Sequence, residues 1–99
     1  MADSPTNPPV PIHARDYIGQ IVVVETSGFY IFSGTLLAVG GEWLTIGDCD
    51  MHDHRESNST REVYILDAVK YGIRKNRDRV LVRLEEVVAI SRAEDVTRY

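Results

Sequence analysis

A series of short runs rich in β-branched residues, separated by glycine turn signals, limits what this chain can fold into. Stiff β-branched side chains favour a pleated strand over a helix. Three such runs cover residues 20–26, 29–39 and 42–47, with a Ser-Gly and a Gly-Gly turn signal between them. Tight turns between successive strands predict an antiparallel meander. Gly34 lies inside the long second run and predicts a bend there, because a glycine within a strand often marks a bulge.

The residue pattern changes in the middle of the chain. Residues 48–59 are polar and aperiodic, which predicts a loop. Ser59-Thr60-Arg61-Glu62 has the spacing of a capping box with Ser59 as N-cap, and Gly72 stands where a C-cap glycine belongs. The rival interpretation is a fourth strand over residues 63–66, and we favour the helix. Four apolar residues would then share one helical face: Ile65, Leu66, Val69 and Ile73.

After a turn at residues 75–78, the chain offers two more short strands, at 80–84 and 87–91. A chain of 99 residues is one domain. We assign it to residues 13–92, beginning with a short helical turn. All four prolines precede it, so residues 1–12 read as a disordered tail, and residues 93–99 read as a charged C-terminal tail. The prediction is a mostly β domain whose five short strands close into a small, strongly bent barrel.

Two stretches resemble the Sm-like family, which includes the LSm proteins and bacterial Hfq. Residues 28–46, GFYIFSGTLLAVGGEWLTI, resemble the first Sm motif. Residues 80–90, VLVRLEEVVAI, resemble the second, with Arg83 on its arginine position. The first motif is matched at Gly28, Phe32, Gly34 and Leu36. The resemblance implies a five-stranded Sm-like (SH3-like) barrel, here with a helix inserted between its third and fourth strands.

The resemblance is structural more than functional. Uridine-binding members carry an Asp and an Asn after the second strand, and these positions fall here near Gly40 and Trp43. Leu84 takes the place of the glycine that follows the arginine. Of the base-reading set only Arg83 is present, so the chain reads as a divergent member in which oligo-uridine binding is weakened.

The resemblance also implies a homo-oligomeric ring, in which the fourth strand of one subunit pairs with the fifth strand of the next. Unpaired strand edges are a general route to such pairing. Both strands are apolar on both faces, which fits coverage by a neighbour and equally fits a simple barrel core. The residues assigned to the interface are Val80, Leu81, Val82, Val87, Val88 and Ile90.

A basic segment is the main candidate for RNA binding. Residues 70–83 hold six of the eleven Lys and Arg residues. Guanidinium groups repeated around a ring can follow a phosphate backbone, and Tyr71 or Trp43 could stack on a base. A solvated helix end explains the same pattern. The assigned residues are Arg83, Trp43, Lys70, Tyr71, Arg74, Lys75, Arg77 and Arg79.

A cluster of metal-ligand residue types occupies residues 48–54, with Asp50, His52 and His54 as weak candidates. Its spacing matches no zinc pattern, and a solvated loop explains it better, so we predict no metal and no cofactor. The sequence also holds no phosphate-cradling glycine loop and no nucleophile elbow, and we predict no enzyme activity.

Charge and composition limit the partners and the cellular compartment that we expect for this chain. A net charge of −4 argues against coating nucleic acid by charge alone, and no DNA partner is expected. No apolar run has the length of a membrane span, and no signal peptide is evident. One cysteine makes the reducing cytoplasm the default compartment. Two hypotheses remain: an Sm-like ring that binds RNA, and a scaffolding ring that does not.

Overall fold

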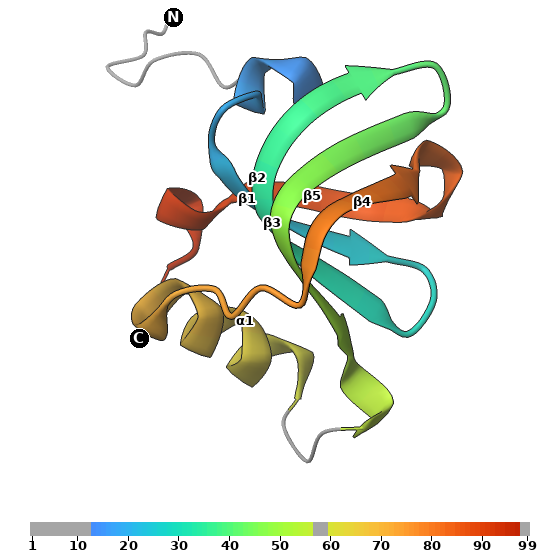
Figure 1. Cartoon of the computed structure of the whole chain (residues 1–99). Coiled ribbons are helices and arrows are strands. Elements are labelled where there is room, and N and C mark those ends of the chain that lie inside the picture. The colour runs from blue at the N-terminus through green and yellow to red at the C-terminus, as the bar shows by residue number, and fades with distance from the viewer. Residues whose placement is uncertain (1–12, 57–59, 98–99) are drawn as a thin grey trace, which may run out of the picture.

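The computed structural model describes residues 13–56 and 60–97, which form a single strongly bent antiparallel sheet with one helix beside it (Figure 1). The five strands are β1 (Ile21–Thr26), β2 (Tyr30–Gly40), β3 (Trp43–Asp53), β4 (Arg77–Arg83) and β5 (Val87–Arg92), in the order β4-β3-β2-β1-β5. The helices are α1 (Arg61–Tyr71) and four short 3₁₀ turns, η1 (Ala14–Tyr17), η2 (His54–Glu56), η3 (Leu84–Glu86) and η4 (Ala93–Asp95). This architecture confirms the predicted five-stranded barrel with a helix between its third and fourth strands.

The bend of the barrel lies where β2 and β3 cross at close range. The register between them shifts at Ser33–Thr35, around the predicted bend at Gly34. A Cβ added to Gly34 would lie 2.6 Å from the carbonyl oxygen of Gly47 and 2.7 Å from Cγ2 of Ile46. Only a residue without a side chain lets the two backbones approach this closely.

The core fills the concave side of the bent sheet. Val22 and Val24 of β1 point into it, while Val23 between them faces the opposite side. This alternation follows from the two-residue period of a strand. The core consists of Val22, Val24, Phe32, Leu36, Leu44, Ile46, Cys49 and Val82.

The loop predicted over residues 48–59 is wrong for its first half, because β3 continues to Asp53. Asp50 to Asp53 pair with Tyr30 to Ser33 of the long β2, across an irregularity at Asp48, whose φ is 45°. The backbone ladder with β2 outweighs the low strand preference of aspartate. The longer β3 also lets β4 begin at Arg77, earlier than predicted, because Cys49 pairs with Arg77.

Helix α1 confirms the helical interpretation of the inserted segment, with a different N-cap. The hydroxyl of Thr60 accepts a hydrogen bond from the backbone N–H of Val63 at 3.2 Å, so Thr60 is the N-cap. Glu62 is then the second helical residue, which is the wrong place for a capping box. The predicted N-cap, Ser59, lies outside the described residues, as does the predicted tail of residues 1–12. Gly72 ends the helix with φ 93°, as predicted.

The two ends of the sheet remain open. Within the described ranges β4 pairs only with β3 and β5 only with β1, so each has one unpaired edge. Beyond β5 the chain turns through η4, where Arg92 donates two hydrogen bonds to Asp95. No helix in the described part of the chain is long and apolar enough to cross a membrane.

Candidate nucleic-acid interface

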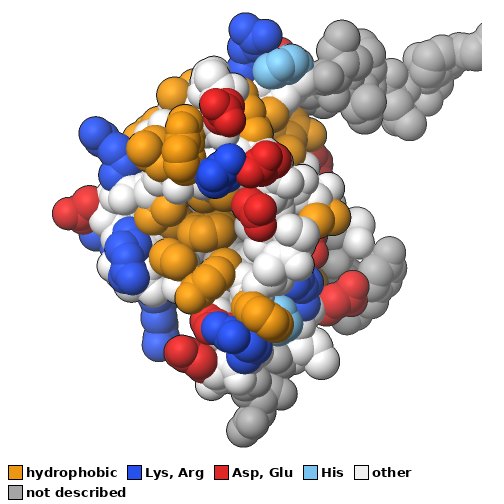
Figure 2. Space-filling view, turned by 90° about the vertical axis from the view of Figure 1, so that its right-hand side faces the viewer, with side chains coloured by type: hydrophobic (Ala, Val, Ile, Leu, Met, Phe, Trp, Pro, Cys, Tyr) orange, Lys and Arg blue, Asp and Glu red, His pale blue; other side chains and the backbone are white. Residues whose placement is uncertain are grey.

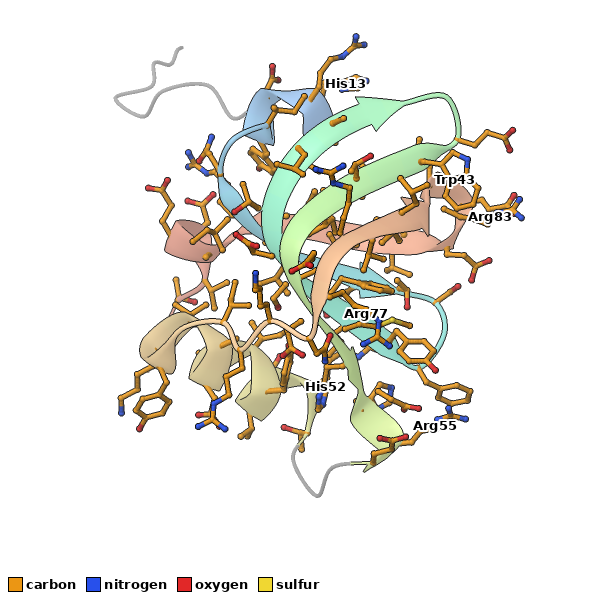
Figure 3. The ribbon with its side chains drawn as sticks, in the orientation of Figure 1. His13, Trp43, His52, Arg55, Arg77 and Arg83 are labelled. Atoms are coloured by element: carbon orange, nitrogen blue, oxygen red, sulfur yellow. The ribbon has the colours of Figure 1, made fainter. Side chains whose placement is uncertain are left out.

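Trp43 and Arg83 form a cross-strand pair at one end of the barrel. Trp43 opens β3, Arg83 closes β4, and the two residues are partners in the register of these strands. The guanidinium carbon of Arg83 lies 5.9 Å from the centroid of the indole ring. Figure 3 shows both side chains at the same corner of the molecule, beside the β2–β3 turn. An exposed aromatic face is thereby joined to a positive charge.

Backbone contacts hold this corner together. The N–H of Leu84 donates to the carbonyl oxygen of Glu42 at 2.8 Å, which ties the end of β4 to the β2–β3 turn. Gly41 in that turn has φ 58°, a left-handed conformation that glycine adopts without strain. Arg83 also forms an ion pair with Glu85 at 2.5 Å. About half of the Arg83 side chain remains exposed, as does 42% of Trp43.

Four residues on one face of β4 have exposed side chains, beginning with Arg83 at this corner and extending along the strand. Alternation along the strand turns Val80 and Val82 toward the core and leaves Arg77, Arg79, Leu81 and Arg83 outside. Arg79 makes no ion pair with any other described residue, while Arg77 donates to the carbonyl oxygen of Asn76. Figure 2 shows Lys and Arg side chains along the left border of an exposed hydrophobic patch. Two more of the predicted RNA-binding arginines, Arg77 and Arg79, therefore share one strand face with the Trp43–Arg83 pair.

The other predicted RNA-binding residues are not part of this surface. Lys70 and Tyr71 end α1, which lies across the molecule from Trp43 and Arg83 (Figures 1 and 3). Arg74 and Lys75 follow in the segment that leads to β4. Lys75 binds two carboxylates, those of Asp48 and Asp78, each at 3.1 Å. The basic segment is contiguous in sequence but divided in space.

The six residues assigned to a subunit interface divide between core and surface. Val82 is buried in the core, and Val80, Val87 and Ile90 pack against it. Leu81 and Val88 are 57% and 69% exposed on the two edge strands. These two side chains are the apolar surface that a neighbouring strand would cover.

Each of the weak metal candidates contacts a residue of α1, and Nε2 of His54 lies 3.2 Å from Nη2 of Arg61. The hydroxyl of Tyr64 donates to Asp50 at 2.5 Å, and the side chain of Asn76 donates to the same carboxylate at 3.0 Å. His52 stacks on the Tyr64 ring at 3.9 Å. Within the described residues, no three His, Cys, Asp or Glu side chains are grouped as a metal site would require. This cluster attaches α1 to β3.

Cys49 beside that cluster is buried in the core, and burial raises the pKa of its thiol to about 11. At pH 8 about one thiol in a thousand would then be ionised, and the thiolate is the reactive form. We expect Cys49 to resist a thiol reagent such as Ellman's reagent in the folded protein and to react fully in denaturant. Rapid labelling of the native protein would show that β2 and β3 open readily at this point.

Comparison with known proteins identifies the fold class of this chain. No protein-family model and no curated protein matches the sequence. Among solved structures, the chain is similar to the Pyrococcus abyssii Sm protein in complex with a uridine heptamer. That match has a TM-score of 0.54 and 16% identity, and covers 79% of this chain and 89% of that one. A chain of the NatC complex bound to CoA matches with a TM-score of 0.52 and 20% identity, over 82% and 84%. The chain therefore has an Sm-like fold.

Sequence reasoning missed how the second face of β1 is covered. Ile21 and Val23 point away from the core, and α1 lies over Val23, which is only 2% exposed. A signal was present, because the run Ile21-Val22-Val23-Val24 is apolar on both faces. A strand that is apolar on both faces is typically covered on both.

Proposed function

We propose that this protein is an Sm-like subunit that assembles into a homo-oligomeric ring and binds RNA at the Trp43–Arg83 corner. The observation that carries the proposal is the cross-strand pairing of an exposed indole with an exposed guanidinium. Stacking of bases on aromatic side chains needs no base-specific contact, and arginine binds phosphate. The uridine heptamer bound by the similar Pyrococcus abyssii Sm protein supports RNA as the ligand class.

Ring assembly is supported by the two open edges of the sheet. β4 and β5 each carry unpaired backbone N–H and C=O groups, and each exposes one large apolar side chain, Leu81 or Val88. Pairing β4 of one copy with β5 of another would satisfy both edges and repeat around a closed ring. The repetition would place Arg77, Arg79 and Arg83 of every subunit along the same surface, and would concentrate positive charge on a chain of net charge −4.

Replacing Arg83 with alanine is the direct test of the RNA site. We expect Arg83→Ala to weaken binding of a short oligo-U RNA about tenfold, the effect of losing about 1.4 kcal/mol per site. The measurement is a fluorescence-anisotropy titration at fixed salt, with Trp43→Ala tested alongside. Arg55→Ala is the matched control, because Arg55 binds Asp53 at the far end of the molecule from Trp43 (Figure 3). Unchanged affinity in Arg83→Ala, or an equal loss in Arg55→Ala, would contradict the site.

A scaffolding ring that binds no RNA is the second candidate. The ion pair with Glu85 favours it, because phosphate would have to compete with a carboxylate already bound to Arg83. The missing Asp and Asn at the base-reading positions favour it as well. In either case we propose a binding protein rather than an enzyme, working in the cytoplasm. A closed oligomer that binds no RNA would favour the scaffolding ring over the RNA-binding ring.

A further inference from the structure

A cavity of about 480 Å³ lies between the C-terminal half of α1 and the outer face of β1 and β2. α1 lies across the molecule from the Trp43–Arg83 corner (Figure 3). Its floor consists of two cross-strand pairs, Ile21 with Thr35 and Val23 with Ser33. Because residues that pair across strands share a face, these four side chains point away from the barrel core and toward the helix. The roof is formed by Ala68, Val69, Gly72 and Ile73.

Small residues in the helix leave this space open. Ala68 and the C-cap residue Gly72 are four residues apart and both line the cavity, and a Cβ added at Gly72 would meet no atom within 4 Å. No residue of α1 is buried, so the helix covers the sheet without packing into it. A volume of this size lies within the range of small-molecule sites, which are mostly apolar with a few polar groups. Ser33 supplies one such group, since it is fully buried and its hydroxyl has only a 3.5 Å contact with Tyr64.

The mouth of the cavity carries an excess of negative charge. Asp48 and Lys75 line it, and the ammonium group of Lys75 is shared between Asp48 and Asp78. Asp78 does not line the cavity, but its carboxylate binds the same ammonium group, so the three groups together carry a net charge of −1. The hydrogen bond from Lys75 reaches Oδ1 of Asp48, and Oδ2 accepts none from the described residues. A positively charged group is attracted to such a mouth, and an anion is repelled.

We propose that this cavity binds a small molecule with an aliphatic body and a positively charged head group, such as an aliphatic amine. The aliphatic part lies against Ile21, Val23 and Val69, and the head group pairs with Asp48. The cavity lining includes neither Trp43 nor Arg83, so the proposal does not rest on the proposed RNA site.

The test is a titration of the full-length protein with octylamine, octanol and octanoate below their aggregation concentrations, followed by methyl NMR. We expect octylamine to shift the Val23, Ala68 and Val69 methyl signals saturably. Octanoate should bind at least about fivefold more weakly, the effect of about 1 kcal/mol of charge interaction. Ala68→Phe, which fills the cavity, should abolish binding, while Val63→Phe adds the same ring on an exposed part of α1 and should retain it.

A second variant, Asp48→Asn, tests the proposal even if Ala68→Phe unfolds the helix. This variant should lower the affinity for octylamine to about that for octanol, because it removes the carboxylate that pairs with the head group and leaves Lys75 bound to Asp78. The absence of saturable shifts at the cavity methyls would overturn the proposal. So would octylamine binding that survives in Ala68→Phe, or octanoate binding as tightly as octylamine.

Discussion

Replacing Gly34 with alanine is expected to destabilise the barrel by about 1–3 kcal/mol, the usual cost of overpacking. The new methyl group would lie 2.6 Å from a backbone oxygen of Gly47, which cannot rotate away as a flexible side chain would. Either β2 and β3 separate at the bend or the core residue Ile46 shifts. For a domain of this size the melting temperature should fall by about 4–8 °C per kcal/mol. Thermal unfolding by circular dichroism at one fixed protein concentration measures it.

Gly40 provides a control in the same strand. A Cβ added there meets no atom within 4 Å. Gly40→Ala should therefore change stability by about 0.5 kcal/mol or less. If Gly34→Ala melts at the same temperature as Gly40→Ala, the close approach of β2 and β3 is not what bends this barrel.

Replacing Leu81 with aspartate is expected to convert the proposed ring into monomers. Leu81 is 57% exposed on the open edge strand β4, where the proposed neighbour would cover it. A carboxylate buried against an apolar strand such as β5 would lose its hydration without gaining a partner, at a cost of several kcal/mol in each interface. The mass from light scattering should fall to that of one chain, 11.2 kDa.

Val63→Asp is the matched control, because Val63 is 44% exposed on α1 and belongs to neither edge strand. It should leave the oligomer intact. Both variants should keep the melting behaviour of a folded barrel, because neither side chain belongs to the core. An oligomer that survives Leu81→Asp would show that the subunits meet through a surface other than the β4 edge.

The three-strand meander and the bend were predictable because they depend on local chemistry. Stiff β-branched runs, turn glycines and Gly34 determine where the backbone extends and where it folds back. The length of β3 was not predictable, because Asp50 and His52 are poor strand formers held by pairing with β2 and by contacts to Tyr64. Those contacts join residues far apart in sequence, and no local pattern announces them.

The candidate site was predictable only in part, for the same reason. The motif resemblance placed Arg83 correctly on the fourth strand, and its pairing with Trp43 depends on the β3–β4 register. The basic segment appears continuous in sequence, but Gly72 ends α1 between Tyr71 and Arg74 and the chain then crosses to β4. The basic segment is divided in space because of the path that the chain takes. A count of charges along the sequence does not reveal that path. The cavity under α1 depends on how closely a helix approaches a sheet, and the sequence does not specify this.

The most direct test of the central proposal combines light scattering with RNA binding on one purified sample of the intact chain. Short oligo-U and oligo-A RNAs are titrated across a salt series while the mass is recorded. An RNA-binding Sm-like ring predicts a closed oligomer, with affinity that falls as salt rises because phosphate contacts release counterions. A monomer that binds neither RNA would contradict both the ring and its function.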